Sequence, residues 1–293
     1  MILSIGEILV DEIEYKKDDK TIIEKHLGGA PLNLAYAVKK AKGTSGFIGA
    51  VGNDYNGEYL NREAHKLDLD YLYLQKVKYS TTVARNTVTD NESHFAFIRD
   101  NSSDYHLNSK NIDLNVFKNL KIMNIGTLML NTKEGQVFFN DMVQKAKEKG
   151  VKIAIDLNIR ESLYKSREDL VQTYRDFVSQ ADIIHASKDE VEYFTGLPLK
   201  EGLKKMNREN KIILVTESES GSTLYYNKKE ISAPSILVSI VDPTGAGDVF
   251  FGTFLKLFEN IDITKTPNIV LKEILYRANV EAAHTVERVG ALN

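Results

Sequence analysis

The sequence contains no cysteine among its 293 residues. Disulfide bonds and thiolate-bound metal sites are therefore excluded, and the chain suits a reducing compartment. Its formal net charge is only −3, so no broad positive field favours nucleic acid as a partner. No apolar run approaches the roughly 20 residues that span a bilayer, and the N-terminal residues lack signal-peptide features. We therefore expect a cytoplasmic protein with neither a nucleic-acid partner nor a membrane partner.

Several familiar catalytic motifs are also absent. No GxxxxGK[ST] phosphate loop occurs, and no GxGxxG follows the first apolar segment, which ranks a nicotinamide-dependent oxidoreductase last. The six histidines show no HExxH or other close spacing, so a zinc site is not expected. No set of nucleophile, histidine and acid stands out either. The chemistry must therefore come from another arrangement.

Short apolar segments alternate with helix-like segments along the chain. The apolar segments are 1–9, 45–51, 121–130, 152–157, 181–187 and 211–216. Several are nearly continuous rather than alternating, which is typical of strands buried on both faces of a parallel sheet. The helix-like segments between them include 31–42, 134–150, 166–181 and 189–196. This order predicts one α/β domain over residues 1–293, a doubly wound, mainly parallel sheet flanked by helices.

Two segments, about 12–26 and 76–104, interrupt the alternation. The first carries the polar turn KKDDK between short apolar stretches, and the second is rich in Thr, Val and Phe around Asp90-Asn91. Both read as hairpins. With no tandem repeat or low-complexity linker in the chain, we expect them to form a small antiparallel sheet inserted as a lid.

The stretch VDPTGAGDVFFGTFL, residues 241–255, places glycines and an acid where a buried helix should begin. Gly245 and Gly247 allow backbone angles and close approaches that a side chain would block. A glycine-rich turn opening a helix presents free N–H groups backed by the helix dipole, which is a site for an anion such as phosphate. Asp248 in that first turn suits a base that takes a proton from a hydroxyl during phosphoryl transfer. The simpler alternative is that Asp248 only caps the helix.

DPTGAGDVFFG, from Asp242, resembles the C-terminal signature of the ribokinase-like sugar kinases, the pfkB family. A second signature, GGAPLN at residues 28–33, is followed by FIGAVGNDYNGEYL at 47–60, as in that family. The resemblance covers essentially the whole chain. It implies a ribokinase-like fold with a β-sheet lid and an ATP-dependent sugar kinase that uses Mg²⁺.

The resemblance also implies the catalytic and acceptor residues. Asp248 is the expected general base, and the amides of Gly245, Ala246 and Gly247 form the anion hole for the γ-phosphate. Gly28 and Gly29 let a sugar approach the backbone, while Asn33 binds its hydroxyls. Asp11, at the end of the expected first strand, holds sugar hydroxyls. The alternatives are helix punctuation for the 28–33 turn and a solvated strand end for Asp11.

Finer features resemble the fructokinases. These are GGAP, the FAFIR segment ending at Arg99 with Ser103-Asp104 after it, and DLNIR ending at Arg160. By analogy both arginines contact the sugar, or its anionic form in keto-sugar-acid kinases. The alternative for each is a surface salt bridge. Tyr105 and the Phe95/Phe97 pair are expected to pack beneath the lid.

The resemblance implies further contacts with the nucleotide, from Ser187, Thr216, Ser218, Gly221 and Asn279. Glu190 corresponds to the glutamate that orders magnesium, through water, and its alternative is a solvated helix face. Ser218 departs from the family pattern, since it replaces the first glycine of the VTxGxxG loop and is expected to reshape the nucleotide contact.

Asp242 and Thr244 are candidate carbonyl donors for K⁺. Family members usually continue beyond the position of Asn293, where part of their monovalent-cation loop would lie, so activation by potassium stays open.

We expect a fructokinase that makes fructose 6-phosphate and that dimerises through the exposed strand edges of its lid. The alternative acceptors are 2-keto-3-deoxygluconate, ribose and a nucleoside. A non-catalytic sugar or nucleotide sensor on the same fold is the alternative from another class.

Overall fold

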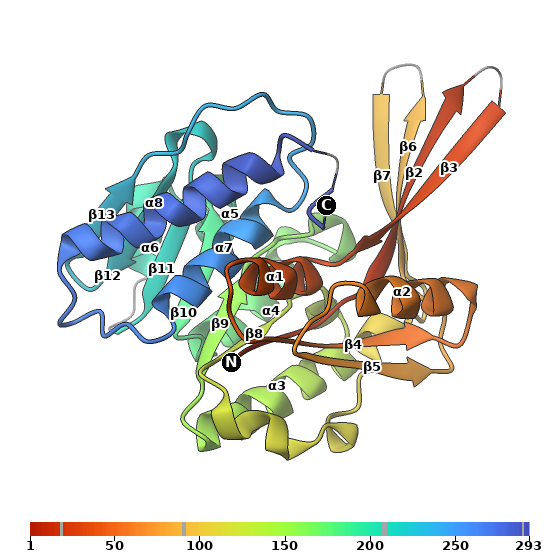
Figure 1. Ribbon diagram of the computed structural model, residues 1–293, viewed down its shortest axis with the longest axis horizontal. Helices are drawn as coiled ribbons and strands as arrows, with labels where there is room; N and C mark the ends of the chain where they lie inside the picture. Colours follow the sequence, from red (N-terminus) through yellow and green to blue (C-terminus); the bar gives the residue numbers. More distant parts are fainter. Residues whose placement is uncertain (18–19, 90–91, 207–209, 289, 293) are drawn as a thin grey trace.

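The computed structural model describes residues 1–17, 20–89, 92–206, 210–288 and 290–292. Figure 1 shows a large sheet flanked by helices and a small sheet that stands away from it, joined at one end. No helix in these described ranges has the length and apolar character needed to cross a membrane.

Within the described residues the large sheet has nine strands in the order β13-β12-β11-β10-β9-β8-β1-β4-β5. Their bounds are β1 Ile2–Ile5, β4 Ser45–Gly52, β5 Tyr71–Val77, β8 Ile122–Ile125, β9 Lys152–Asp156, β10 Ile183–Ser187, β11 Ile212–Thr216, β12 Ser222–Tyr226 and β13 Lys229–Ala233. The strands from β5 to β11 pair in parallel, while β12 and β13 add an antiparallel edge. The expected parallel sheet is confirmed, whereas the sequence patterns did not predict β5 or the β12–β13 hairpin.

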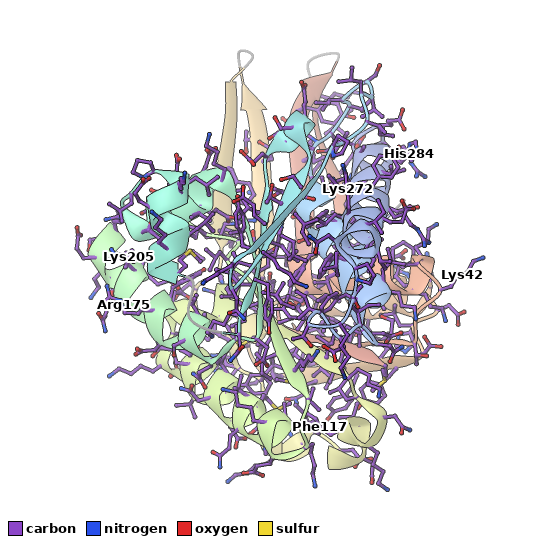
Figure 2. The ribbon with its side chains drawn as sticks, turned by 90° about the vertical axis from the view of Figure 1, so that its left-hand side faces the viewer. Lys42, Phe117, Arg175, Lys205, Lys272 and His284 are labelled. Atoms are coloured by element: carbon purple, nitrogen blue, oxygen red, sulfur yellow. The ribbon has the colours of Figure 1, made fainter. Side chains whose placement is uncertain are left out.

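Helices cover both faces of this sheet. Their bounds are α1 Ala30–Lys40, α2 Tyr55–His65, α3 Lys133–Glu148, α4 Arg167–Gln180, α5 Lys188–Thr195, α6 Leu199–Met206, α7 Ala246–Phe258 and α8 Asn268–Thr285. Figure 2 shows Arg175 and Lys205, from α4 and α6, on the opposite side of the molecule from Lys272 and His284 of α8. The helices that the sequence pattern indicated are all present.

The two helical layers bury opposite faces of the same strands, because successive strand side chains point to opposite sides of a sheet. In β1, Leu3 and Ile5 pack in one cluster with Phe139 of α3. Ile2 packs in a second cluster with Phe254 of α7. This burial on both faces explains why the strand sequences are nearly continuously apolar.

The order of the strands also locates the binding region. The chain leaves β1 for β4 and β5 on one side and later returns to β8 on the other side. Ligands of doubly wound sheets bind at the carboxyl ends of the strands near such a switch. The functional residues are therefore expected at the ends of β1, β8 and the strands beyond β8.

The small sheet has the order β3-β2-β6-β7, with β2 Leu9–Lys17, β3 Lys20–Gly28, β6 Val83–Thr89 and β7 Glu92–Ile98. It contains the two expected hairpins, β2–β3 and β6–β7, which are antiparallel. The hairpins join through a parallel pair, β2 with β6, so the sheet is not antiparallel throughout. Residues 18–19 and 90–91, where the turns were expected, lie outside the described residues.

Asp11 does not end the first strand, as the sequence pattern had indicated, because that strand stops at Ile5. The chain bends at Gly6, where an added β-carbon would lie 2.6 Å from Pro31 Cγ. A residue with a side chain could not pack so closely against Pro31. Asp11 therefore belongs to β2 of the small sheet.

Candidate active site

A cavity of about 530 Å³ opens at the carboxyl ends of β9, β10 and β11. Segment 235–240, the start of α7 and one side of α8 complete its walls. Its volume is in the range of small-molecule and cofactor sites, which are mostly apolar with a few polar groups. The polar groups here come from strand ends and from the first turn of α7.

Helix α7 begins at Ala246, and Gly245 is its N-cap with φ 79°. A β-carbon on Gly245 would lie 2.1 Å from Ala291 Cβ, so both the backbone angle and the space require glycine. The Ala246 amide donates weakly to Pro243 O at 3.3 Å. Amides of a first helical turn lack intrahelical acceptors, so this turn is suited to an anion, and its binding of phosphate stays a prediction.

Asp248 lies in the same turn and lines the cavity. Its Oδ2 accepts a hydrogen bond of 2.8 Å from Asn33 Nδ2 of α1. Burial, and then the negative charge of Asp156, raise the pKa of Asp248 to about 7, against the opposing effect of the Asn33 bond. A carboxyl that ionises near neutral pH is suited to take a proton from a hydroxyl.

The turn before α1 is tightly packed. Gly29 is the N-cap with φ 123°, and a β-carbon there would lie 2.4 Å from the carbonyl oxygen of Glu7. A β-carbon on Gly28 would lie 2.0 Å from Asp11 Oδ2. Asn33 is buried, and its side-chain amide donates its hydrogen bond to Asp248. The structure thus places Asp11 against Gly28 and joins Asn33, four residues after Gly29, to Asp248, although the 530 Å³ cavity includes none of these four residues.

The Asp11 carboxyl has a pKa above the ordinary value for an aspartate. Burial, and then the charge of Asp242, raise its pKa to about 6, while Arg160 opposes the shift. The Asp11 carboxyl is thus not a solvated strand end, and the positive charge of Arg160 is not enough to offset the effect of burial on its pKa. A partner that accepts or donates hydrogen bonds, such as a sugar hydroxyl, suits it.

The two arginines have different surroundings. Arg99 is almost fully buried and pairs with Asp104 through Nε and Nη2, while Nη1 donates to Asn131. It is therefore not a surface salt bridge; it packs at the base of the lid, outside the 530 Å³ cavity, and its contact with the sugar stays a prediction. Arg160 does line the cavity, and its Nη1 donates to the carbonyl of Ile159.

Of the aromatic residues expected to pack beneath the lid, Phe97 packs near Leu9 and Leu128, whereas Phe95 is 57% exposed. Tyr105 lies beneath the Arg99 guanidinium, 4.8 Å from ring centroid to Cζ.

Ser187 and Glu190 begin α5 together. The Ser187 hydroxyl accepts from the Glu190 amide, and Glu190 Oε2 accepts from the Ser187 amide at 2.8 Å, which is a capping box. Glu190 Oε1 accepts from the Ile159 amide at 2.7 Å. Burial, and then Asp156, raise the pKa of Glu190. Glu190 is therefore not a solvated helix face, and it fixes the strand ends around the cavity.

The 216–221 loop lies at the end of β11. Ser218 has φ 48°, the left-handed conformation that glycine adopts most easily. The backbone path that a glycine would allow is therefore kept, with a side chain added at the cavity wall. Gly221 has φ 97°, and a β-carbon there would lie 2.2 Å from Ala233 O. Thr216 also lines the cavity.

Asn279 of α8 donates from Nδ2 to Ala233 O at 3.0 Å and to Pro234 O at 3.1 Å. It therefore holds the start of segment 235–240 against α8, on the wall of the cavity.

Asp242 ties two loops together. Its Oδ1 accepts from the Thr244 amide at 2.9 Å, and its Oδ2 accepts from the Gly290 amide at 2.8 Å. Partial burial raises the pKa of Asp242, but these hydrogen bonds outweigh burial and lower the pKa below its ordinary value. The side chain thus keeps a negative charge beside the loop whose carbonyls were the candidate K⁺ donors, which is compatible with a cation there.

Two groups were not predicted from the sequence. His185 of β10 lies in the cavity wall with its Nδ1 3.0 Å from Asp156 Oδ1. Glu7, after β1, is buried with Oε2 unpartnered among the described residues, and burial above all raises its pKa to about 8. The usable signal was that polar residues end neighbouring strands, since the ends of parallel strands meet at one edge.

The acidic groups fit a divalent cation that arrives with phosphate. Asp156, Glu190 and Asp248 all line the cavity, and Asp156 contributes to the raised pKa of the other two. In the part of the chain that the structure describes, no group of three His, Cys, Asp or Glu side chains is arranged to hold a metal alone. Mg²⁺ commonly keeps several waters and binds through one or two carboxylates and substrate phosphates.

A sequence model described as the pfkB family of carbohydrate kinases matches residues 1–293. The chain belongs to this family. The sugar kinase is 31% identical over 310 residues to the probable fructokinase-5 of Arabidopsis thaliana, covering 100% of the chain and 93% of the relative. An uncharacterized sugar kinase of Pyrococcus horikoshii, solved with ATP, is 27% identical with a TM-score of 0.84, over 100% of this chain and 94% of that one. A fructokinase of Xylella fastidiosa with bound ATP, 23% identical, shares the fold with a TM-score of 0.90, over 99% and 93% of the two chains. The predicted family and fold are confirmed.

Proposed function

We propose that this kinase transfers the γ-phosphate of ATP to fructose and forms fructose 6-phosphate. The observation that carries the proposal is the position of Asp248. It lies in the first turn of α7, beside the 530 Å³ cavity, and its carboxylate accepts from Asn33 in the turn on the acceptor side. One carboxyl therefore stands between a phosphate-binding turn and a turn suited to a sugar.

The proposed reaction needs one proton transfer and one phosphoryl transfer. The acceptor hydroxyl gives its proton to the Asp248 carboxylate as its oxygen forms a bond to the γ-phosphorus. The bond between the γ-phosphorus and the bridging oxygen of ADP breaks, and ADP leaves with the electron pair. The amides of Gly245, Ala246 and Gly247 stabilise the charge on the transferring group.

The other residues position the two substrates. Thr216, Ser218 and Gly221 form the loop at which we place the nucleotide, and Asn279 supports the wall beside it. Ser187 and Glu190 fix the strand ends near its phosphates. Mg²⁺ would neutralise charge on the phosphates, and its placement near Glu190, through water, is part of the proposal, as is K⁺ near Asp242 and Thr244.

Fructose is favoured as the acceptor because the probable fructokinase-5 of Arabidopsis thaliana matches the chain end to end. Arg99 favours a neutral acceptor, because its guanidinium already pairs with Asp104 and donates to Asn131 rather than facing an anionic group of a substrate. A sugar acid is the second candidate, and the observation that favours it is Arg160, a cation in the cavity wall.

The test is release of ADP from Mg-ATP with fructose, ribose, 2-keto-3-deoxygluconate and adenosine in turn. We expect the highest kcat/KM with fructose. We expect the variant Asp248→Asn to lose about 10²- to 10⁴-fold in kcat, the usual contribution of a general base. Asp176→Asn, an exposed acid on α4, is the matched control and should retain activity.

Each contrary result has a distinct meaning. A preference for the sugar acid would keep the mechanism and replace the acceptor. ATP binding with no turnover on any acceptor would instead support a non-catalytic sensor. Full activity in Asp248→Asn would remove the proposed base.

The same proposal includes a homodimer formed through the small sheet and a cytoplasmic location. Ile23, Phe95 and Ile98 of this sheet are 47%, 57% and 48% exposed, and strands β3 and β7 present open edges. Exposed apolar groups on an edged sheet are suited to a second copy of the chain. The absence of cysteine is compatible with a reducing cytoplasm.

A further inference from the structure

A hydrogen bond between Asn33 and Asp248 joins the first turns of two helices. Asn33 is the fourth residue of α1, Asp248 is the third residue of α7, and Asn33 Nδ2 donates to Asp248 Oδ2 at 2.8 Å. Within the residues that the structure describes, no other group donates to this carboxylate. The turn proposed for the acceptor is thus connected directly to the proposed base.

The orientation of the Asp248 carboxylate depends on this bond. The terminal torsion of an aspartate side chain is broad and roughly two-fold, so covalent geometry alone does not hold the carboxylate in one plane. An ionised carboxylate only accepts hydrogen bonds, so the Asn33 amide must present Nδ2 to it rather than Oδ1. Because Oδ2 of Asp248 is engaged, Oδ1 is the oxygen left to take the proton of an acceptor hydroxyl.

The Asn33 side chain is itself held in place. Its backbone N–H donates to Gly29 O at 2.9 Å, which fixes it in the first turn of α1, and only 7% of the residue is exposed. A β-carbon on Gly245 would lie 3.4 Å from Asn33 Nδ2. The glycine before α7 therefore leaves the space through which the amide reaches Asp248.

The oxygen of the same amide is left without a partner. Asn33 Oδ1 is buried and accepts no hydrogen bond from the described residues. An unpartnered buried oxygen is unfavourable, so this orientation is imposed by the bond that Nδ2 makes. A buried oxygen is also out of reach of an acceptor that enters from solvent. The contact of Asn33 with the reaction therefore runs through Asp248.

We propose that Asn33 is a positioning residue that holds Asp248 by Oδ2 and thereby directs Oδ1 at the acceptor hydroxyl. The inference rests on the proposed function, in which Asp248 is the base. It differs from the expectation drawn from the family resemblance, in which Asn33 binds hydroxyls of the sugar. The two roles have different kinetic effects, because loss of a sugar contact raises KM, whereas loss of positioning lowers kcat.

The test is the single-turnover rate with Mg-ATP and fructose, both saturating, because this rate reports the chemical step. The variant Asn33→Leu removes the amide and fills its space, so that no water takes its place. We expect the rate to fall roughly 10- to 100-fold, the cost of a misplaced catalytic group, while the fructose concentration for half the maximal rate stays within about twofold of the wild type.

A double-mutant cycle shows whether Asn33 acts through Asp248. In the background of Asp248→Asn the base is already absent, so Asn33→Leu should lower the rate by less than about twofold further. A residue with an independent role would lower the rate by the same factor in both backgrounds. Asn124→Leu is the matched control, since Asn124 is buried on β8 with an unpartnered Oδ1 and donates to Ser4. It should leave the rate unchanged.

Three results would overturn the inference: an unchanged rate in Asn33→Leu, a raised fructose requirement at an unchanged maximal rate, and equal losses in the two backgrounds. If Asn33→Leu fails to fold, Asn33→Ala, which avoids crowding near Gly245, takes its place in the same cycle. If another acceptor proves better than fructose, the cycle is run with that acceptor and decides in the same way. Lack of turnover by the wild type on every acceptor would refute the proposed function and the inference with it.

Discussion

At the scale of single residues, Asp248 must carry a negative charge where burial and a neighbouring carboxylate disfavour it. Its pKa of about 7 results from burial first and from Asp156 second. An unfolded chain releases the same proton near 3.9. Between these values the native state binds more protons than the unfolded state, so ionisation of Asp248 destabilises the fold as the pH rises. The loss is complete above about pH 7.

Asp248→Asn should therefore be more stable than the wild type, although we expect it to lose most of its activity. The gain in free energy of unfolding should be small at pH 4, grow up to about pH 7 and stay constant above it, because the amide cannot ionise. Urea unfolding of both proteins at pH 4, 5.5, 7 and 8.5 measures this difference. A difference that does not vary with pH would show that the carboxyl titrates normally.

Single residues could be predicted from the sequence where the backbone conformation requires a particular residue type, such as glycine. The sequence predicted a turn at Gly245 that only glycine can form, and the structure explains this by its φ of 79° and the lack of space for a side chain. It could not indicate that Asp156 and His185 meet, because the two are joined only by the register of β9 with β10. Nor did it show that Arg99 is buried against Asp104, which depends on how the base of the lid packs.

At the scale of elements, the small sheet is the part that the core explains least. In strand β7, Phe97 packs toward the body while Phe95, two residues earlier on the same face, is exposed. A four-stranded sheet with exposed apolar residues and unpaired strand edges favours association with another chain over a monomer in solution.

Light scattering should therefore give a solution mass near twice the 33.0 kDa of one chain. Phe95→Asp should shift the mass toward that of a monomer, because a buried carboxylate at the interface is costly. Val137→Asp, at a 70% exposed position on α3, is the matched control and should stay dimeric. A monomeric wild type would refute the proposed dimer.

Element patterns predicted the parallel strands other than β5, and most of the helices between them, because burial on both faces makes strand sequences continuously apolar. They predicted the two hairpins of the small sheet from turn composition. The parallel join of β2 to β6 was not predictable, since it links strands with a whole α/β segment between them. The β12–β13 hairpin was missed because its strands alternate weakly and end the sheet.

At the scale of the whole molecule, two signatures far apart in the sequence meet at one point. Asn33 and Asp248 lie 215 residues apart and share a hydrogen bond of 2.8 Å. The doubly wound topology makes this possible, because α1 and α7 lie on the same face of the sheet. The turn proposed for phosphate and the turn proposed for the acceptor thereby meet at one carboxyl group.

The most direct test is the pH dependence of kcat/KM for fructose, with ATP saturating at every pH so that a change in nucleotide affinity does not enter. We predict that kcat/KM rises about tenfold per pH unit and levels off near pH 7, the pKa of Asp248. A profile that is flat between pH 5 and 8 in a turning-over enzyme would contradict the assignment of Asp248 as the base.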